Sequence, residues 1–249
     1  MSAERQSGGE TGAGARRRNF LLAALSATDH QALDAHLAPV ELAPNTVQYE
    51  PDDAIEWVWF PCTAVLSVVT VMRDGRTVES DTVGREGAVG ILAALGRSRA
   101  TSRTFTQIPG LALRLSAARL RAQAEHSPAL RKLLVHHALA NLAQAHQGVA
   151  CNALHDASAR LKRWLLMCQD RTAAPIIRTT QQHLATMVGV QRTTVSSLLA
   201  GLVQQGIIAT GRSRVEILDR DRLAQGVCEC YATIQANYDA LIGEAPSAA

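Results

Sequence analysis

The segment spanning residues 179–199 constrains this chain more than any other. Thr180 can cap a first helix, and Gly189 stands where the chain must reverse direction with a positive φ. Apolar residues at helical spacing line the inward sides of two helices: Leu184, Ala185 and Val188 in the first, and Val195, Leu198, Leu199 and Leu202 in the second. Two helices joined by a tight turn, with Val190 at the corner, are the helix-turn-helix pattern.

The second helix of this motif exposes polar side chains near its N-terminus. They are Gln191, Arg192, Thr193, Ser196 and Ser197, and none of them is acidic. A helix that reads the major groove of DNA needs such donors, because an arginine fork can bond to both acceptors of a guanine. Arg192 is therefore the predicted base contact, while Thr180 and Gln181 are predicted to position the DNA backbone.

A basic β-hairpin, or wing, is expected directly after the motif. Strand-like residues 207–209 and 215–218 flank a turn at residues 211–214. The arginines of this turn, Arg212 and Arg214, would lie against the DNA backbone. The alternative is a helical hairpin that packs and does nothing more. The turn glycine, the apolar spacing and the basic wing occur together, which favours DNA binding.

The first third of the chain has the character of an antiparallel β-roll. Between residues 46 and 115, short β-branched or aromatic runs alternate with turn signals such as residues 51–53. The pair Asp74-Gly75, with valine-rich runs on both sides, is a strong hairpin signal. Several short strands at this spacing predict a small barrel or roll.

Residues 116–171 indicate helix, and Ser127 with Pro128 would begin a long one. Residues at coiled-coil spacing form a seam on it: Val135, Ala138, Leu139, Leu142, Ala145 and Val149. A second apolar row, Leu130, Leu133, Leu134 and His137, faces another side. Spacing alone leaves two interpretations open, namely a core helix of one domain or a helix shared with a symmetric partner.

The cysteines give no metal or disulfide pattern in sequence. Five cysteines are an odd number, which argues against a disulfide framework and fits a reducing cytoplasm. Cys228 and Cys230 are one residue short of the C-x-x-C spacing, and no second pair lies nearby in sequence. Ordinary helix packing is the favoured interpretation of this pair, so no metal is predicted.

An enzyme is not expected either, because the common nucleotide-binding and hydrolase motifs are missing from the sequence. The charged pair Arg85-Glu86 is interpreted as an ion pair that braces a turn, not as catalytic. No apolar stretch reaches the ~20 residues of a membrane helix, so no membrane partner is expected and a cytoplasmic location is predicted. The net charge of +3 permits DNA binding where the excess gathers on one face.

The order of β-roll, long helix and winged helix-turn-helix resembles the Crp-Fnr superfamily of bacterial transcription regulators. The resemblance also rests on residues 49–53, 59–61 and 83–90, which look like strand-and-turn segments of the family's cyclic-nucleotide-binding-like roll. It implies a homodimer joined along the seam of the long helix and a palindromic operator in double-stranded DNA. RNA polymerase is a further candidate partner.

The sequence departs from the family pattern where cyclic-AMP responders hold their ligand. Gly90 aligns with the family's glycine, but Ile91 replaces the glutamate that holds the ribose. The nearest match to the phosphate-binding Arg-Ser pair is Arg103 with Thr104, and His146 replaces a residue that reaches the adenine. Each unpaired polar group would cost ~1–3 kcal/mol. Control by cyclic AMP is therefore not expected, and these five residues are predicted to line the pocket of an unknown effector.

Two other interpretations stay open. The chain could be a ligand-binding regulatory module whose helix-turn-helix contacts protein, or a haem- or redox-sensing variant. Iron–sulfur sensing in this family uses N-terminal cysteines, and none precedes Cys62. The candidate haem ligands are His36, His126, His136, His137, His146 and His155. No cofactor is predicted.

The α+β chain is thus expected to have four parts. They are a disordered arm at 1–18, a sensor-like β-roll at 19–126, a dimerisation helix at 127–155 and a winged helix-turn-helix domain at 156–249. A last helix, at residues 223–242, is expected to pack on the winged domain with Tyr231 and Tyr238 as anchors.

Overall fold

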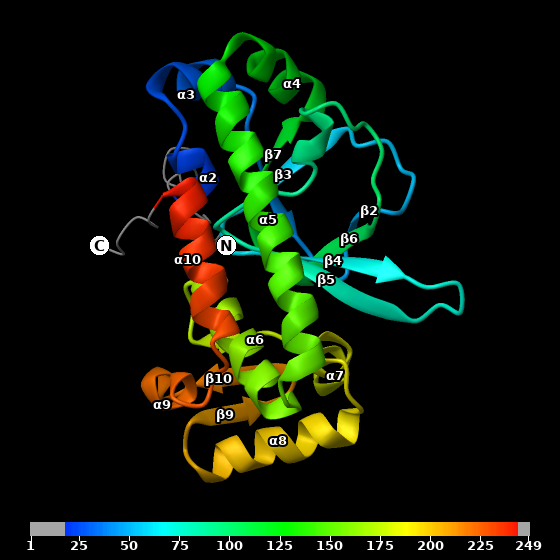
Figure 1. Ribbon diagram of the computed structural model, residues 1–249, viewed down its shortest axis with the longest axis vertical. Helices are drawn as coiled ribbons and strands as arrows, with labels where there is room; N and C mark the ends of the chain where they lie inside the picture. The colour runs from blue at the N-terminus through cyan, green and yellow to red at the C-terminus, as the bar shows by residue number, and fades with distance from the viewer. Residues whose placement is uncertain (1–17, 244–249) are drawn as a thin grey trace, which may run out of the picture.

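A computed structural model describes residues 18–243 of the chain. Almost all of the expected arm at 1–18 lies outside the described residues. The molecule is elongated, with a β-roll at one end, a helical domain with a small sheet at the other, and one long helix, α5, running between them (Figure 1). This is the α+β class with the β-roll, long helix and winged helix-turn-helix predicted from the sequence, and that prediction is confirmed.

Two antiparallel sheets build the roll. One has the order β1-β7-β3, with β1 at Ala38–Leu42, β7 at Gly110–Ser116 and β3 at Trp57–Pro61. The other has the order β2-β6-β4-β5, with β2 at Val47–Tyr49, β6 at Arg103–Ile108, β4 at Val65–Val71 and β5 at Thr77–Val83. Apolar side chains from both sheets fill the interior: Leu42, Tyr49, Ala64, Leu66, Val83, Val89 and Ala112. The interior of the roll is therefore filled by packed side chains.

The predicted hairpin is the joint between β4 and β5. Val71 pairs with Thr77, and Gly75 has a φ of 82°, which a residue with a side chain adopts only with strain. The two strands project from the body of the roll (Figure 1). The turn signal in the sequence was thus sufficient to place this hairpin.

Short helices close the roll before α5 begins. They are α2 at Phe20–Ala23, α3 at Ala27–Asp34, the 3-10 helix η1 at Ile91–Ala93 and α4 at Ala117–His126. Asn19 is fully buried and caps α2, and its side-chain amide donates to the carbonyls of Pro61 and Gly87 at 2.8 Å each. One side chain therefore fixes the start of the described chain onto two loops of the roll.

The long helix α5 spans Pro128–Leu154. Ser127 caps it, because its hydroxyl accepts a hydrogen bond of 3.1 Å from the Leu130 amide. Leu130, Leu134 and His137 are buried against the roll, as the second apolar row predicted. His155 ends the helix with an extended backbone, and Asp156 caps the next helix. The junction between the two halves of the molecule is therefore very short.

The C-terminal domain contains a three-stranded sheet of order β8-β10-β9 and several helices. The helices are α6 at Ala157–Thr172, α7 at Gln181–Val188, α8 at Arg192–Gln204 and α9 at Arg220–Ala224, and the last helix of the chain, α10 at Cys230–Ile242, follows this domain. The strands are β8 at Ile176–Ile177, β9 at Ile208–Gly211 and β10 at Arg214–Ile217. Leu161, Leu165 and Val195 are fully buried in its core.

The prediction for the last helix is wrong in two respects. The expected single helix is divided into α9 and α10, because residues 225–229 form a loop around Gly226. Helix α10 lies alongside α5, not on the winged domain (Figure 1). The Tyr238 hydroxyl donates to Asn141 of α5 at 2.6 Å, and only Tyr231 anchors to the C-terminal domain, at Asp170 of α6. Within residues 18–243, no helix combines the length and apolarity needed to cross a membrane.

Candidate nucleic-acid interface

The helix-turn-helix is built from local signals that the structure confirms. The Thr180 hydroxyl accepts a hydrogen bond of 3.1 Å from the His183 amide and so caps α7. Gly189 ends α7 in the left-handed conformation, with a φ of 71°. The Val190 amide then bonds to the Ala185 carbonyl at 3.0 Å, which fixes the angle between α7 and α8. The apolar sides of both helices are buried in one core.

The N-terminal turn of α8 faces solvent. Gln191, Arg192, Thr193 and Ser197 are all exposed. Ser196 is half-buried, and its hydroxyl donates to the Gln181 amide oxygen at 2.7 Å, which orients both side chains between the two helices. The free N–H groups at the start of a helix favour anions. This turn therefore presents hydrogen-bond donors and the positive end of the helix dipole to the same solvent-facing surface.

The wing lies beside this turn. Strands β9 and β10 pair from Arg214 with Gly211 to Ile217 with Ile208, and Arg212 is exposed in the turn between them. Ser213 has a φ of 54°, and its carbonyl accepts a bond of 3.1 Å from the Thr179 amide. The wing turn is thus tied to the start of α7. The Arg214 side chain lies close over the Gly211 backbone, since a Cβ at Gly211 would be 2.7 Å from Nε of Arg214.

A hollow of about 460 Å³ lies between the starts of α7 and α8 and the wing. Four of the predicted DNA-contact residues line it: Thr180, Gln181, Arg192 and Arg214. Of the other five, Ser196 is half-buried, and Gln191, Thr193, Ser197 and Arg212 are exposed. Residues far apart in the sequence therefore share one polar surface, with an arginine from the helix and an arginine from the wing.

The other side of α7 docks onto the roll. The His183 ring meets Phe105 of β6 edge-on, with ring centroids 6.0 Å apart. Burial lowers the pKa of His183, so the ring is neutral at pH 7. Met187 of α7 lies 3.9 Å from the Ser67 hydroxyl of β4. The orientation of the helix-turn-helix is thus set partly by the roll.

The five residues predicted to line an effector pocket occupy different environments. Gly90 has a φ of 87° and lies under the Tyr49 hydroxyl, while Ile91 is 3% exposed. Thr104 is buried in β6, and Arg103 stacks on Phe105 and pairs with Glu50 at 3.3 Å. His146 is exposed on α5. A small pocket of about 220 Å³ contains Arg103 but none of the other four residues, and β4, β5 and α7 contribute to its lining.

The seam residues of α5 face away from the roll. The large ones are exposed, with Val135 at 40%, Leu139 at 47%, Leu142 at 51% and Val149 at 71%. Ala138 and Ala145 are half-buried between them. Since the opposite side of the helix packs on the roll and α10 covers a third side, this apolar stripe is the part of α5 without a covering element within the described residues.

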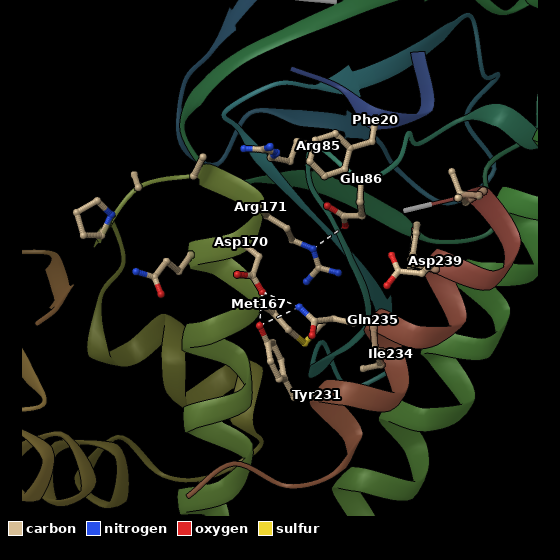
Figure 2. Close-up of a pocket in the computed structure, with 17 residues that line it drawn as sticks. Phe20, Arg85, Glu86, Met167, Asp170, Arg171, Tyr231, Ile234, Gln235 and Asp239 are labelled. Atoms are coloured by element: carbon tan, nitrogen blue, oxygen red, sulfur yellow. Dashed lines mark hydrogen bonds and ion pairs between the residues drawn. The ribbon is translucent and has the colours of Figure 1, made fainter. Parts of the chain in front are cut away.

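The prediction that Arg85 and Glu86 form an ion pair is wrong. Glu86 pairs with Arg171 of α6 at 2.6 Å, whereas the Arg85 guanidinium stacks on Phe20 at 4.3 Å (Figure 2). Arg171 also donates to Gln144 of α5 at 2.8 Å. The turn at Glu86 therefore joins the roll, α5 and α6.

A pocket of about 710 Å³ opens beside this network, between the roll, α6 and α10 (Figure 2). Asp170 of α6 accepts hydrogen bonds from Tyr231 at 2.6 Å and from Gln235 at 3.2 Å across its floor. No sequence pattern indicated this pocket, because its walls come from four separate segments.

The histidines proposed as haem ligands are mostly engaged within the protein. His137 is fully buried, its Nε2 is 3.1 Å from the Ala88 amide, and burial lowers its pKa. His126 and His136 bond through Nδ1 to the carbonyls of Ala122 and Leu241. His155 lies apart from these, because it meets Cys151, Cys228 and Cys230 in one cluster. Sequence spacing missed this cluster, although Cys151 and His155 stand four residues apart on a helical pattern.

Comparisons with known proteins agree with this geometry. A family model described as a Crp-like helix-turn-helix domain matches residues 159–225. No match is found among curated protein sequences. FixK2 from Bradyrhizobium japonicum has a similar structure, with a TM-score of 0.66 and 17% identity, over 77% of this chain and 98% of that one. TTHB099, a CRP-family transcriptional regulator from Thermus thermophilus, matches with a TM-score of 0.61 and 19% identity, over 75% and 95%.

The c-di-GMP responsive global regulator CLP from Xanthomonas campestris also has a similar structure. Its TM-score is 0.58 at 18% identity, over 82% of this chain and 98% of CLP. At such identities these structures report the fold, while the family model reports the helix-turn-helix domain. Together they confirm the resemblance to Crp-Fnr regulators that the sequence indicated.

Proposed function

Because this chain combines a Crp-like helix-turn-helix domain with the fold of Crp/Fnr-type transcription regulators, we propose that it binds a palindromic DNA operator as a homodimer. The observation that carries the proposal is the polar surface shared by α7, α8 and the wing, where Arg192 and Arg214 line one hollow. In this proposal α8 enters the major groove, Arg192 reads a guanine, and Arg214 and Arg212 contact phosphates.

The homodimer is supported by the apolar stripe on α5. Leu139, Leu142 and Val149 are each about half exposed or more, at a spacing suited to pairing with the same helix of a second copy. A two-fold axis along this seam would present two α8 helices to successive major grooves, about 34–36 Å apart. The operator is then a palindrome with half-sites one helical turn apart.

Independence from cyclic AMP is supported by the interior of the roll. Ile91 is buried and offers no carboxylate for a ribose hydroxyl. Arg103 already has an acidic partner, Glu50, and an aromatic one, Phe105. Apolar side chains from both sheets of the roll fill the space between the two sheets. A buried nucleotide would lose partners there and gain none, so we propose that DNA binding does not need this ligand.

A competition experiment tests the proposal. Binding of the purified protein to an operator and to a random duplex is measured by fluorescence anisotropy over a range of salt concentrations. Arg192→Ala should reduce the preference for the operator by about 5- to 150-fold, the equivalent of ~1–3 kcal/mol. Arg214→Ala should weaken binding to both duplexes and reduce the salt slope by about 1. Arg119→Ala, an exposed arginine on α4, is the matched control and should change neither.

An unchanged preference in Arg192→Ala would contradict the role of this residue. Absence of duplex binding at every salt concentration would favour the alternative, in which the helix-turn-helix contacts protein.

A further inference from the structure

Three cysteines and one histidine meet where α5 ends and α10 begins. Cys151 lies in the last turn of α5 and His155 directly follows this helix, while Cys228 lies in the loop before α10 and Cys230 is the first residue of α10. Their four ligand atoms all lie within 4.8 Å of one another. The three cysteines are 0%, 7% and 1% exposed, and the histidine side chain is 22% exposed. The cluster is therefore closed on the protein side and open at the histidine.

The spacing of these atoms matches a tetrahedral ion. The sulfurs of Cys151 and Cys228 are 3.6 Å apart, and the Cys230 sulfur is 3.5 Å from Nδ1 of His155. An ion about 2.3 Å from each sulfur and about 2.0 Å from the nitrogen requires separations of about 3.8 Å and about 3.5 Å at tetrahedral angles. Three thiolates and one imidazole are a donor set that Zn²⁺ prefers in structural sites.

Neighbouring side chains orient two of the proposed ligands, His155 and Cys230. Nε2 of His155 lies 3.1 Å from a carboxylate oxygen of Glu229, which places the ring proton on Nε2 and leaves the Nδ1 lone pair facing the sulfurs. The Gln147 amide donates to the Cys230 sulfur at 3.0 Å, which fixes the position of this side chain. A carboxylate behind a ligating histidine is the usual outer shell of a zinc site.

We propose that Cys151, His155, Cys228 and Cys230 bind one Zn²⁺ ion. The ion would join the end of α5 to the start of α10, across the junction where His155 and Asp156 connect α5 to α6. Because metal binding free energy is folding free energy, the site would hold α10 against α5 and stiffen this junction. This site goes beyond the proposed function and does not depend on it.

Two simpler interpretations explain less of the geometry. A disulfide between Cys151 and Cys228 would leave Cys230 and His155 without a role, and no disulfide joins these two cysteines in the structure. Packing of apolar thiols would explain burial of the sulfurs, but it would not orient a histidine nitrogen toward them with a carboxylate behind it.

Titration with Co²⁺ tests the proposal directly. The full chain is stripped of metal with a chelator under reducing conditions, and Co²⁺ is added while the visible spectrum is recorded. One Co²⁺ per chain should bind, with the strong ligand-field and charge-transfer bands of a tetrahedral thiolate site, and Zn²⁺ should displace it. The same Zn²⁺ addition should raise the thermal unfolding temperature.

Variants assign the site. Cys228→Ser and His155→Asn should each weaken Co²⁺ binding by more than about 100-fold, and Glu229→Gln should weaken it by about 10-fold. Cys62→Ser, at a buried cysteine of the roll outside the cluster, is the matched control and should leave binding unchanged. Since Glu229 is exposed and His155 is partly exposed, these two variants keep the test valid if a cysteine variant fails to fold.

Three results would overturn the proposal. They are the absence of thiolate bands on Co²⁺ addition, equal weakening in the Cys62→Ser control, and a Cys151–Cys228 disulfide that persists under reducing conditions.

Discussion

Loss of the buried ion pair between Arg171 and Glu86 should destabilise the protein strongly. The two side chains are 6% and 16% exposed, and Arg171 also bonds to Gln144, so the pair joins α6, the roll and α5. Arg171→Met keeps an apolar stem of similar length and removes the charge. The Glu86 carboxylate then stays buried without its cation. Among the described residues, it keeps the hydrogen bond of 3.0 Å from the Gly84 amide.

The magnitude follows from burial. Removing one partner of a buried pair costs about 3–5 kcal/mol, because the other charge is left uncompensated. For a chain of this size, 1 kcal/mol shifts the unfolding temperature by about 2–4 °C, so Arg171→Met should lower it by about 6–20 °C. The pair Arg76–Asp74 has nearly the same separation, 2.7 Å, but its side chains are 83% and 52% exposed. Arg76→Met should therefore leave the unfolding temperature nearly unchanged.

Circular dichroism recorded during heating measures the unfolding temperatures of Arg171→Met and Arg76→Met. Adding Glu86→Gln to Arg171→Met should recover much of the loss, because the neutral amide leaves no buried charge unpaired. Equal shifts in Arg171→Met and Arg76→Met, or no recovery in the double variant, would refute the reasoning from burial.

Two further predictions concern the seam and the pH dependence of stability. Leu142→Asp places a charge on the apolar stripe of α5 and should convert a dimer to a monomer in analytical ultracentrifugation. Val78→Asp, at a residue 54% exposed against 51% for Leu142, should leave the mass unchanged, and a dimeric Leu142→Asp would contradict the seam. Burial beneath α5 raises the pKa of Asp81 from 3.8 to about 7. Between these two pH values the native state keeps a proton that the unfolded chain releases, so the free energy of unfolding falls as the pH rises from 3.8 to about 7. Asp81→Asn should therefore gain about 3 kcal/mol relative to the wild type between about pH 5 and about pH 8 in urea unfolding, and a parallel pH dependence of the two proteins would exclude this role.

Local signals in the sequence predicted the elements that carry the proposed function. The cap at Thr180 and the positive φ at Gly189 depend on residues within a few positions, so the helix-turn-helix could be read directly. The same holds for the hairpin at Gly75 and for the start of α5 at Pro128. Each of these features rests on backbone chemistry that neighbouring residues fix.

Contacts between distant segments could not be predicted in this way. Glu86 and Arg171 are 85 residues apart, and Cys151 and Cys228 are 77 apart. No spacing rule connects such residues, because only the packing of α6 and α10 on the rest of the molecule brings them together. The position of α10 was mispredicted for the same reason, since its apolar face did not specify whether α5 or the winged domain would cover it.

Selection of genomic fragments by the purified, ligand-free protein tests the central claim most directly. The bound duplexes are sequenced after several rounds of competition with random DNA. A palindrome with half-sites one helical turn apart, enriched by the wild type and lost with Arg192→Ala, is the predicted result. Recovery of fragments without a shared symmetric sequence would contradict a homodimer that reads DNA through α8.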